Sequence, residues 1–272
     1  MNMNKRQYFL RGKVSIHSRL FAVIFFSAGI VSAAPFVINS AGTQIDGTAI
    51  QSSSDGTVLL TTRNGQTLTF RSGTYRQASA DKPDAMTQVE ASVKRGDFSG
   101  AAAILRRLKE QYKFLGWDLR AAQMLARVEL AQKNFSAAVT EYDALFAAQP
   151  ALKKVPAERA GYMQALLGAG RTKEVSAMID EDIASGSREA AARAQLVRGD
   201  MKAAAGQHEE ALLDYLRTLL LFKEQSSALP EATYKAAMAL KKLNDPRSAE
   251  YLQKVIREFP DSEFAIKAKG EK

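Results

Sequence analysis

Apolar residues recur along the later two thirds of the chain with a spacing that predicts paired helices. From Asp84 onward they return every three to four residues, the period of an α-helix with one buried face. Within this stretch a pattern repeats: a turn-former, an aromatic or aliphatic residue, a small residue, and a large apolar residue four positions later. The small-residue positions are Ala101, Ala138, Val175, Ala211 and Ala249, separated by 37, 37, 36 and 38 residues. Such steady spacing predicts five repeated helix pairs.

Each position of this pattern has a physical reason. The turn-former ends the first helix of a pair, and Phe98 or Phe135 covers the turn. The small residue lies where the two helices cross most closely, because a larger side chain would force them apart. Gly199 is expected to fill the equivalent close position on a first helix, and Pro150 and Pro260 should end second helices. The large residues that pack one turn after the small ones are Leu105, Tyr142, Ile179 and Tyr215.

The repeated pattern resembles the tetratricopeptide repeat (TPR), whose unit is about 34 residues long. The likeness covers residues 84–269, and the extra residues in each unit indicate slightly longer helices or loops. Val175 in place of alanine and His208 in place of an aromatic residue depart from the family pattern. The resemblance implies a TPR-like α-solenoid of about five helix pairs.

Residues 36–78 have a different composition, rich in Gly, Thr and Ser, with short stretches in which apolar and polar residues alternate. Asn64-Gly65 lies between two β-favouring runs, which predicts a hairpin with a two-residue turn. That turn would pair Leu59 with Phe70 and place Leu68 on the same face. A sheet of this size is marginal alone, so it should form a tiny barrel or pack on the helices.

A second turn at Asp55-Gly56 and a strand around 45–50 bring the expected number of strands to three or four. The motif from Gly42 through Ile45-Asp46-Gly47, Asp55 to Leu60 and Asn64-Gly65-Gln66 resembles small barrel modules of the SLA-homology type. That resemblance implies no catalytic residue. We expect the β module to occupy 34–78 and a linker to occupy 79–83.

The beginning of the chain has the composition of an export signal. A basic stretch leads to Leu20–Ile30, an uncharged apolar run of eleven residues, whereas spanning a bilayer takes about 20 residues. The run has the length of the central region of a signal peptide, and small residues follow it. We predict a signal peptide over 1–33, cleaved after Ala33, with Ala34 as the mature N-terminus. An uncleaved membrane anchor is the alternative. The whole chain is therefore predicted to be mainly α, with a signal peptide, a small β module and a TPR-like solenoid.

Charge and cysteine content narrow the class of protein. The net charge is +9, but residues 1–33 hold five Lys or Arg and no carboxylate. Without them 33 Lys and Arg stand against 29 Asp and Glu, a net charge of +4 that is no nucleic-acid footprint. The absence of cysteine excludes disulfides, thiol chemistry, Cys-based zinc sites and an acylated N-terminal cysteine. An exported chain without cysteine fits a bacterial periplasm, so we expect a periplasmic or secreted protein.

The sequence offers no catalytic or metal-binding constellation, so we predict no enzyme activity, no cofactor and no metal. His208, the one histidine after residue 33, falls at a turn position of the repeat, where a structural role is expected. The acidic run 180–182 lacks the alternating loop ligands of calcium and is interpreted as a solvated helix face. Gly168–Arg171 follows a helix and lacks the Lys-Ser/Thr of a phosphate loop. Trp117 is expected to pack in a core rather than stack on a ligand.

The groove implied by the TPR resemblance is the remaining candidate site. In the family, the first helix of each repeat lines a concave surface that binds a partner. Glu90 and Asp200 fall on this face, but cations outnumber carboxylates. Because Arg can hold a carboxylate through two parallel hydrogen bonds, an acidic peptide or a chain-terminal carboxylate is the expected ligand. A merely solvated groove is the alternative. The predicted partner-binding residues are Lys94, Arg120, Gln123, Arg127, Gln164, Arg193, Tyr234, Met238 and Lys241.

These features together predict a periplasmic scaffold for protein–protein interaction, in the assembly or organisation of the cell envelope. The alternative is a structural envelope component whose β module contacts peptidoglycan or a secretion or pilus pore. No nucleic-acid partner and no transmembrane segment after signal cleavage are expected, and peripheral membrane contact stays open.

Overall fold

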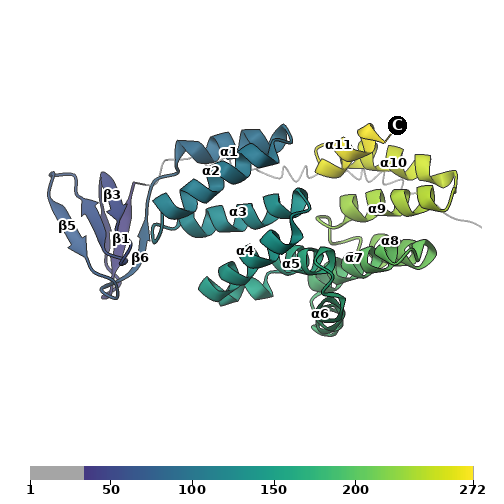
Figure 1. Cartoon of the computed structure of the whole chain (residues 1–272), viewed down its shortest axis with the longest axis horizontal. Coiled ribbons are helices and arrows are strands. Elements are labelled where there is room, and N and C mark those ends of the chain that lie inside the picture. The colour runs from purple at the N-terminus through teal and green to yellow at the C-terminus, as the bar shows by residue number, and fades with distance from the viewer. Residues whose placement is uncertain (1–33, 272) are drawn as a thin grey trace, which may run out of the picture. The chain divides into compact units, whose positions relative to one another are not determined.

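Helices follow one another in pairs from residue 84 to residue 270 of the computed structural model, which describes residues 34–271 (Figure 1). The predicted signal peptide lies outside the described residues. A 3-10 turn, Pro150–Lys154, precedes the third pair, and α11 (Glu263–Gly270) follows the fifth. The first helices are α1 (Asp84–Lys94), α3 (Trp117–Ala131), α5 (Pro156–Gly168), α7 (Arg188–Ala204) and α9 (Leu229–Lys242). The second helices are α2 (Phe98–Gln111), α4 (Phe135–Ala148), α6 (Thr172–Ala184), α8 (His208–Leu221) and α10 (Arg247–Glu258).

One turn geometry closes all five pairs. Just after each first helix, one residue adopts a left-handed backbone that reverses the chain. In every turn the next amide donates to the carbonyl five positions back, at 2.9 Å. The prediction of a turn-former is confirmed, although Lys133 rather than Asn134 takes the left-handed position in the second pair. The five residues are Gly96, Lys133, Gly170, Gly206 and Asn244, with φ of 77°, 62°, 79°, 78° and 56°.

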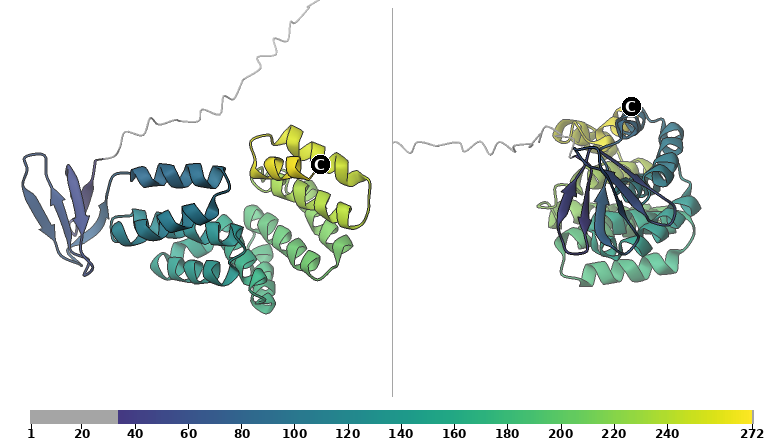
Figure 2. Two further views of the ribbon diagram at one scale, coloured as in Figure 1. Left: turned by 45° about the horizontal axis from the view of Figure 1, so that its top comes forward. Right: turned by 90° about the vertical axis from the view of Figure 1, so that its left-hand side faces the viewer.

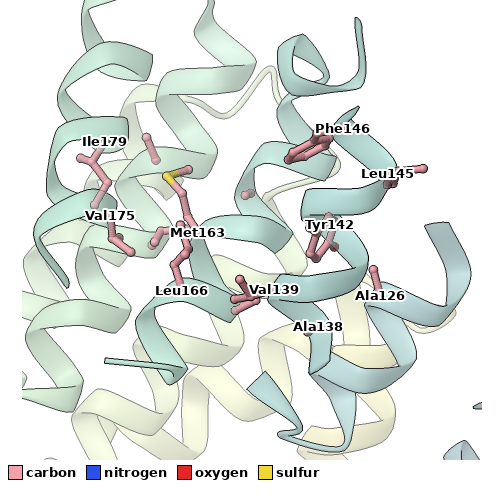
Figure 3. Packing of buried hydrophobic residues seen from close by; sticks show 14 of the residues in the cluster. Ala126, Ala138, Val139, Tyr142, Leu145, Phe146, Met163, Leu166, Val175 and Ile179 are labelled. Atoms are coloured by element: carbon pink, nitrogen blue, oxygen red, sulfur yellow. The ribbon is translucent and has the colours of Figure 1, made fainter. Parts of the chain in front are cut away.

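The register of the repeat is confirmed in the first four pairs. The four small-residue positions from Ala101 to Ala211 are fully buried, and the large residues one turn later are at most 3% exposed. Figure 3 shows Ala138 and Tyr142 on α4 beside the buried side chains of the third pair. Gly199 is also at a close crossing, because a Cβ there would lie 2.4 Å from the ring of Tyr215.

The fifth pair differs by one residue. Ala249, predicted to be the buried small residue, is exposed, whereas Leu252 and Val255 are buried. Counting back from them places Ser248 at the close position. The start of the helix also differs. In the first four pairs the amide of the small residue donates to the carbonyl four positions back, as Ala101 does to Asp97, whereas Ser248 donates to Asp245 and Ala249 to Pro246, three positions back. The first turn of α10 is thus tighter than that of the other second helices, which changes the residue that faces the first helix.

Before α1, six short strands form two antiparallel sheets of three strands each, ordered β2-β1-β6 and β3-β4-β5. The prediction of three or four strands is wrong in number. The segment expected as one strand around 45–50 is two strands that bend at Gly47, where a Cβ would lie 2.6 Å from the carbonyl oxygen of Thr61. The strands are β1 (Phe36–Asn39), β2 (Gln44–Asp46), β3 (Ala49–Ser52), β4 (Val58–Thr61), β5 (Thr67–Phe70) and β6 (Tyr75–Ser79).

The predicted hairpin exists, but its register is wrong by one residue. Leu60 pairs with Leu68, and Val58 rather than Leu59 pairs with Phe70. The loop has three residues instead of two, and only Gly65 has a positive φ, 82°. A type I turn followed by a left-handed glycine is the common three-residue hairpin. Because side chains alternate, the shift places Leu60 in the core in place of Leu59.

The β module packs on the loop between α2 and α3 (Figures 1 and 2). Leu115 of that loop is 2% exposed and completes the core formed by strand residues such as Val58 and Leu60. Ala80 links the two parts, because its amide donates to the carbonyl of Leu115 at 3.2 Å and its carbonyl accepts from Trp117 Nε1 at 2.9 Å. Trp117 also packs on the core of the first pair, which confirms its predicted structural role.

Candidate protein-binding surface

The predicted groove residues lie on the first helices, α1, α3, α5, α7 and α9. We call the surface formed by these side chains the inner face. The structure groups most of the predicted residues into three sets with different surroundings, whereas Lys94 is exposed at the end of α1 and Met238 lines a pocket. One set joins α3 to α5, a second joins α5 and α7 to α9, and a third contacts α11.

The set on α3 and α5 is organised by a carboxylate that the sequence analysis missed. Glu158 of α5 has a side chain that is 1% exposed, and the guanidinium of Arg127 on α3 pairs with its Oε1. Gln123 Nε2 donates to the same oxygen at 2.6 Å. Arg120, one turn earlier on α3, is exposed and donates to Gln123 Oε1 at 3.4 Å. The side chains of α3 are therefore aligned by one buried acid.

The guanidinium of Arg127 is fixed by an ion pair and is still accessible to solvent. Its side chain remains 55% exposed while it pairs with Glu158. Beneath the pair lies the hydroxyl of Tyr142, which is fully buried. Burial and the charge of Glu158 raise the pKa of Tyr142, so the phenol stays protonated at neutral pH. A fixed, partly exposed guanidinium can donate hydrogen bonds to a carboxylate of another molecule, and little side-chain entropy is lost when it does so.

The second set is a network around Lys235, another residue that the sequence analysis missed. Its ammonium lies 2.6 Å from Asp200 Oδ2 on α7 and 2.5 Å from Glu231 Oε1 on α9. Tyr215 donates to Asp200 at 2.9 Å, and Gln164 of α5 donates to Glu231 at 3.2 Å. This network ties α5, α7 and α9 together through polar side chains.

Burial and charge act in opposite directions within this network. Burial raises the pKa of Asp200 above its ordinary value, although the ammonium of Lys235 opposes this effect. Burial would also raise the pKa of Glu231, but Lys235 and Arg193 lower it overall. The two carboxylates raise the pKa of Lys235 despite its burial. The ammonium of Lys235 thus has two carboxylate partners within the network, Asp200 and Glu231.

Arg193 is not a free cation either. Its side chain is 16% exposed and lies 3.3 Å from Glu189. It also donates to Ser227 Oγ at 3.2 Å, in the loop before α9. Together with the Lys235 network, this leaves the basic part of the inner face at its α1 and α3 end, where Lys94, Arg120 and Arg127 are exposed.

The predicted residues of the fifth pair separate. Tyr234 and Lys241 contact Glu271, which follows α11, at 3.4 Å and 2.8 Å, and Tyr234 packs on the ring of Phe264. They face α11 rather than the Lys235 network. Met238, one turn after Tyr234 on α9, lines a pocket of about 220 Å³ together with His208, Tyr215, Lys235 and Lys242.

The acidic run 180–182 is only partly a solvated face. Asp180 and Glu181 are exposed as predicted, but Asp182 is 7% exposed and lies 2.6 Å from Arg159 Nε. Burial raises the pKa of Asp182, and Arg159 opposes that shift. Within residues 34–271, no group of three or more His, Cys, Asp or Glu side chains could hold a metal ion. In the same part of the chain, no helix combines the length and apolar character needed to cross a membrane.

The buried partners were missed because helical periodicity identifies a face but not the residue opposite it. Lys235 carried one local signal, since Glu231 lies four residues earlier on the same helix and such pairs interact. Glu158 carried none, because its partners Gln123 and Arg127 are more than 30 positions away.

A comparison with known protein families matches the fifth helix pair. The family model described as a tetratricopeptide repeat matches residues 231–262, which contain most of α9, all of α10 and the turn between them. No curated protein matches the chain. Among solved structures, a thermophilic TPR protein in Thermus thermophilus is similar, with a TM-score of 0.49 and 17% sequence identity, over 69% of this chain and 96% of that chain. The chain is thus mainly α, a TPR-like α-solenoid preceded by a small β module.

Proposed function

We propose that this protein is an exported, non-enzymatic scaffold that binds an acidic segment of a partner protein at the α1 and α3 end of its inner face. The observation that carries the proposal is the partly exposed guanidinium of Arg127, which buried Glu158 holds on the same face of α3 as Arg120. TPR-like helix pairs are protein-binding elements, so the partner is a protein. Its acidic character follows from the three exposed cations Lys94, Arg120 and Arg127.

Pre-positioning explains why this end of the inner face is favoured over the other. A side chain that is already ordered loses less entropy on binding than a free arginine. The Lys235 network has satisfied its charges internally, so a ligand there would have to break existing ion pairs. Binding through exposed arginines should also weaken as salt rises, because ions screen surface charges.

The test starts with a pull-down from envelope extract, using the protein in its exported form. The recovered partner is then titrated against Lys94→Glu with Arg120→Glu, which reverses two exposed charges and leaves the buried Glu158 pair intact. We expect the dissociation constant to rise about tenfold or more. The matched control is Arg107→Glu with Lys173→Glu, which reverses exposed charges on second helices and should leave affinity unchanged. Equal affinity for both variants, with no salt dependence, would place the partner on another surface.

Export and the alternative function have separate tests. N-terminal sequencing of protein recovered from the envelope should begin at Ala34, and intact chains beginning at Met1 in the membrane fraction would contradict the proposed cleavage. Sedimentation with purified cell wall, without any protein partner, would favour the alternative of a structural component that contacts peptidoglycan through the β module.

A further inference from the structure

The outer surface of α8 carries large apolar side chains that the helical repeat does not require. Leu213, Leu220 and Leu221 are 52%, 74% and 59% exposed. Residues 213 and 220 are seven positions apart, nearly two turns of helix, and so they lie on one face. Leu216 is half-buried beside them. Exposed large apolar side chains gathered on one face of a helix mark an interaction site more often than isolated ones do.

The other second helices provide an internal comparison. Leu213 and Leu220 occupy the second and the ninth positions after the small residue of the close crossing, which is buried in the first four pairs and is half-buried Ser248 in the fifth. All the equivalent residues are exposed, and none is a large apolar residue. The equivalents are Ala103 and Glu110 in α2, Thr140 and Ala147 in α4, Ala177 and Ala184 in α6, and Glu250 and Arg257 in α10. The fold therefore accepts small or charged residues at these positions, and the leucines of α8 need another explanation.

The charges around the leucines are arranged with opposite signs at the two ends of α8. Glu209 and Glu210 are exposed in its first turn. At the other end, Arg188 donates to the carbonyl of Leu221, and Lys223 is exposed just beyond the helix. Near the middle, the charge of Arg217 is matched by Asp214 at 2.7 Å.

This arrangement is self-complementary. If two α8 helices pack antiparallel about a two-fold axis between residues 216 and 217, Leu213 of one chain meets Leu220 of the other. The same register brings Glu210 opposite Lys223, and the helix dipoles oppose each other favourably. A parallel arrangement would instead place the acidic ends together and the basic ends together.

We propose that α8 is a self-association surface, through which two copies of this chain form an antiparallel, two-fold symmetric dimer. The occupant of the leucine face is thus a second copy, because the charge pattern complements itself. This surface lies on a second helix and is separate from the inner face, so the proposal does not depend on the proposed function.

The first test measures the mass in solution of the exported form of the protein by sedimentation velocity over a range of concentrations. We expect a dimer, and we expect Leu213→Glu with Leu220→Glu to raise its dissociation constant at least about tenfold. The matched control, Ala177→Glu with Ala184→Glu, places the same charges at the equivalent positions of α6 and should remain dimeric. Circular dichroism of each variant establishes that helix content is kept. A monomer at every concentration, or a dimer unaffected by the leucine substitutions, would overturn the proposal.

The second test determines how the two α8 helices are aligned. The native sequence has no cysteine, so introduced cysteines are the only ones that can form disulfides. Chains with Leu213→Cys are mixed with differently tagged chains with Leu220→Cys under mild oxidation. The antiparallel register predicts that the mixed disulfide forms faster than either self-disulfide. Faster self-disulfides would indicate a parallel contact and would overturn the proposal. Equivalent cysteines at 177 and 184 report the rate of random collisions.

Discussion

The helical array and the β module differ in how each builds its core. All five helix pairs repeat a left-handed turn, and the first four repeat a buried small residue with a large buried residue four positions later, so the packing of each pair follows from its own sequence. The β module has strands of three to five residues and obtains Leu115 from the loop between two helices to complete its core. The array is thus specified locally and repeatedly, whereas the module depends on contacts with a part of the chain outside it.

Buried charge adds a second difference between the two regions. The array contains buried carboxylates that are paired across helices, among them Glu129, Glu158 and Asp214. Such pairs contribute little net stability but are costly to break from one side. The core of the module consists of apolar side chains. Substitutions that leave a charge unpaired should therefore be most damaging in the array.

The largest expected effect comes from Asp214→Ala. This carboxylate has no exposed side-chain surface and pairs with Arg198, Lys202 and Arg217 at 2.7 to 2.8 Å. Its removal leaves three clustered cations and should lower the free energy of unfolding by about 3–5 kcal/mol. Urea unfolding followed by far-UV circular dichroism measures it. Glu263→Ala, which breaks an exposed pair with Lys267, is the control and should change little. Equal losses in the two variants would refute the role assigned to burial.

A smaller effect, confined to one region, is expected from Leu115→Ala. The substitution removes a side chain that is 2% exposed from the core of the module, at a cost of about 2–5 kcal/mol. Because the packing of the helix pairs does not depend on the module, hydrogen exchange should accelerate in β4 and β5 while α7 to α9 keep their protection. Leu125→Ala, of equal size but inside the array, should instead accelerate exchange in the helices around it. Uniform loss of protection in both variants would mean that the two regions unfold as one unit.

The corrected hairpin predicts a smaller effect again, from Gly65→Ala. Its φ is 82° and nothing lies within 4 Å of the position of an added Cβ, so only backbone strain opposes the change. The expected cost is about 1–2 kcal/mol, visible as faster exchange in β4 and β5. Asn64→Ser should cost less, because only a two-residue turn would need a positive φ at that position. If Asn64→Ser cost more stability than Gly65→Ala, the result would favour the two-residue turn instead.

The smallest expected effect is the contribution of Asp214 to the pH dependence of the free energy of unfolding. Burial raises its pKa, but hydrogen bonds from Arg198, Lys202 and Arg217 outweigh burial and lower it overall. A lowered folded-state pKa stabilises the fold above the unfolded value of about 3.9, and this contribution is lost as pH falls through the folded value. The stability difference between the native protein and Asp214→Asn should therefore shrink below about pH 4. A difference that is constant from pH 7 to pH 3 would contradict this assignment.

Most of the helical fold could be predicted from the sequence, and less of the candidate site. Four of the five small-residue positions were placed correctly, and Ala249 was one residue away from Ser248, because the first turn of α10 is tighter than that of the other second helices. In the site, Arg127 was assigned to the right helix face, but its partner Glu158 was not foreseen. Tyr234 fell on a face that α11 covers. Neither error concerns helix formation; both concern what lies opposite a helix.

The sequence by itself determined which segments form helices, where the helices turn and which side chains face inward, because all three depend on neighbours within a few residues. Only the tertiary structure decided the strand register of the module, which cations remain free, and which leucines remain exposed. These depend on partners far along the chain, as Gln164 and Glu231 show with 67 residues between them. The local spacing of residues predicts the same helices and turns in each pair. It does not predict which distant side chain will be close enough to neutralise a charge or cover an apolar face.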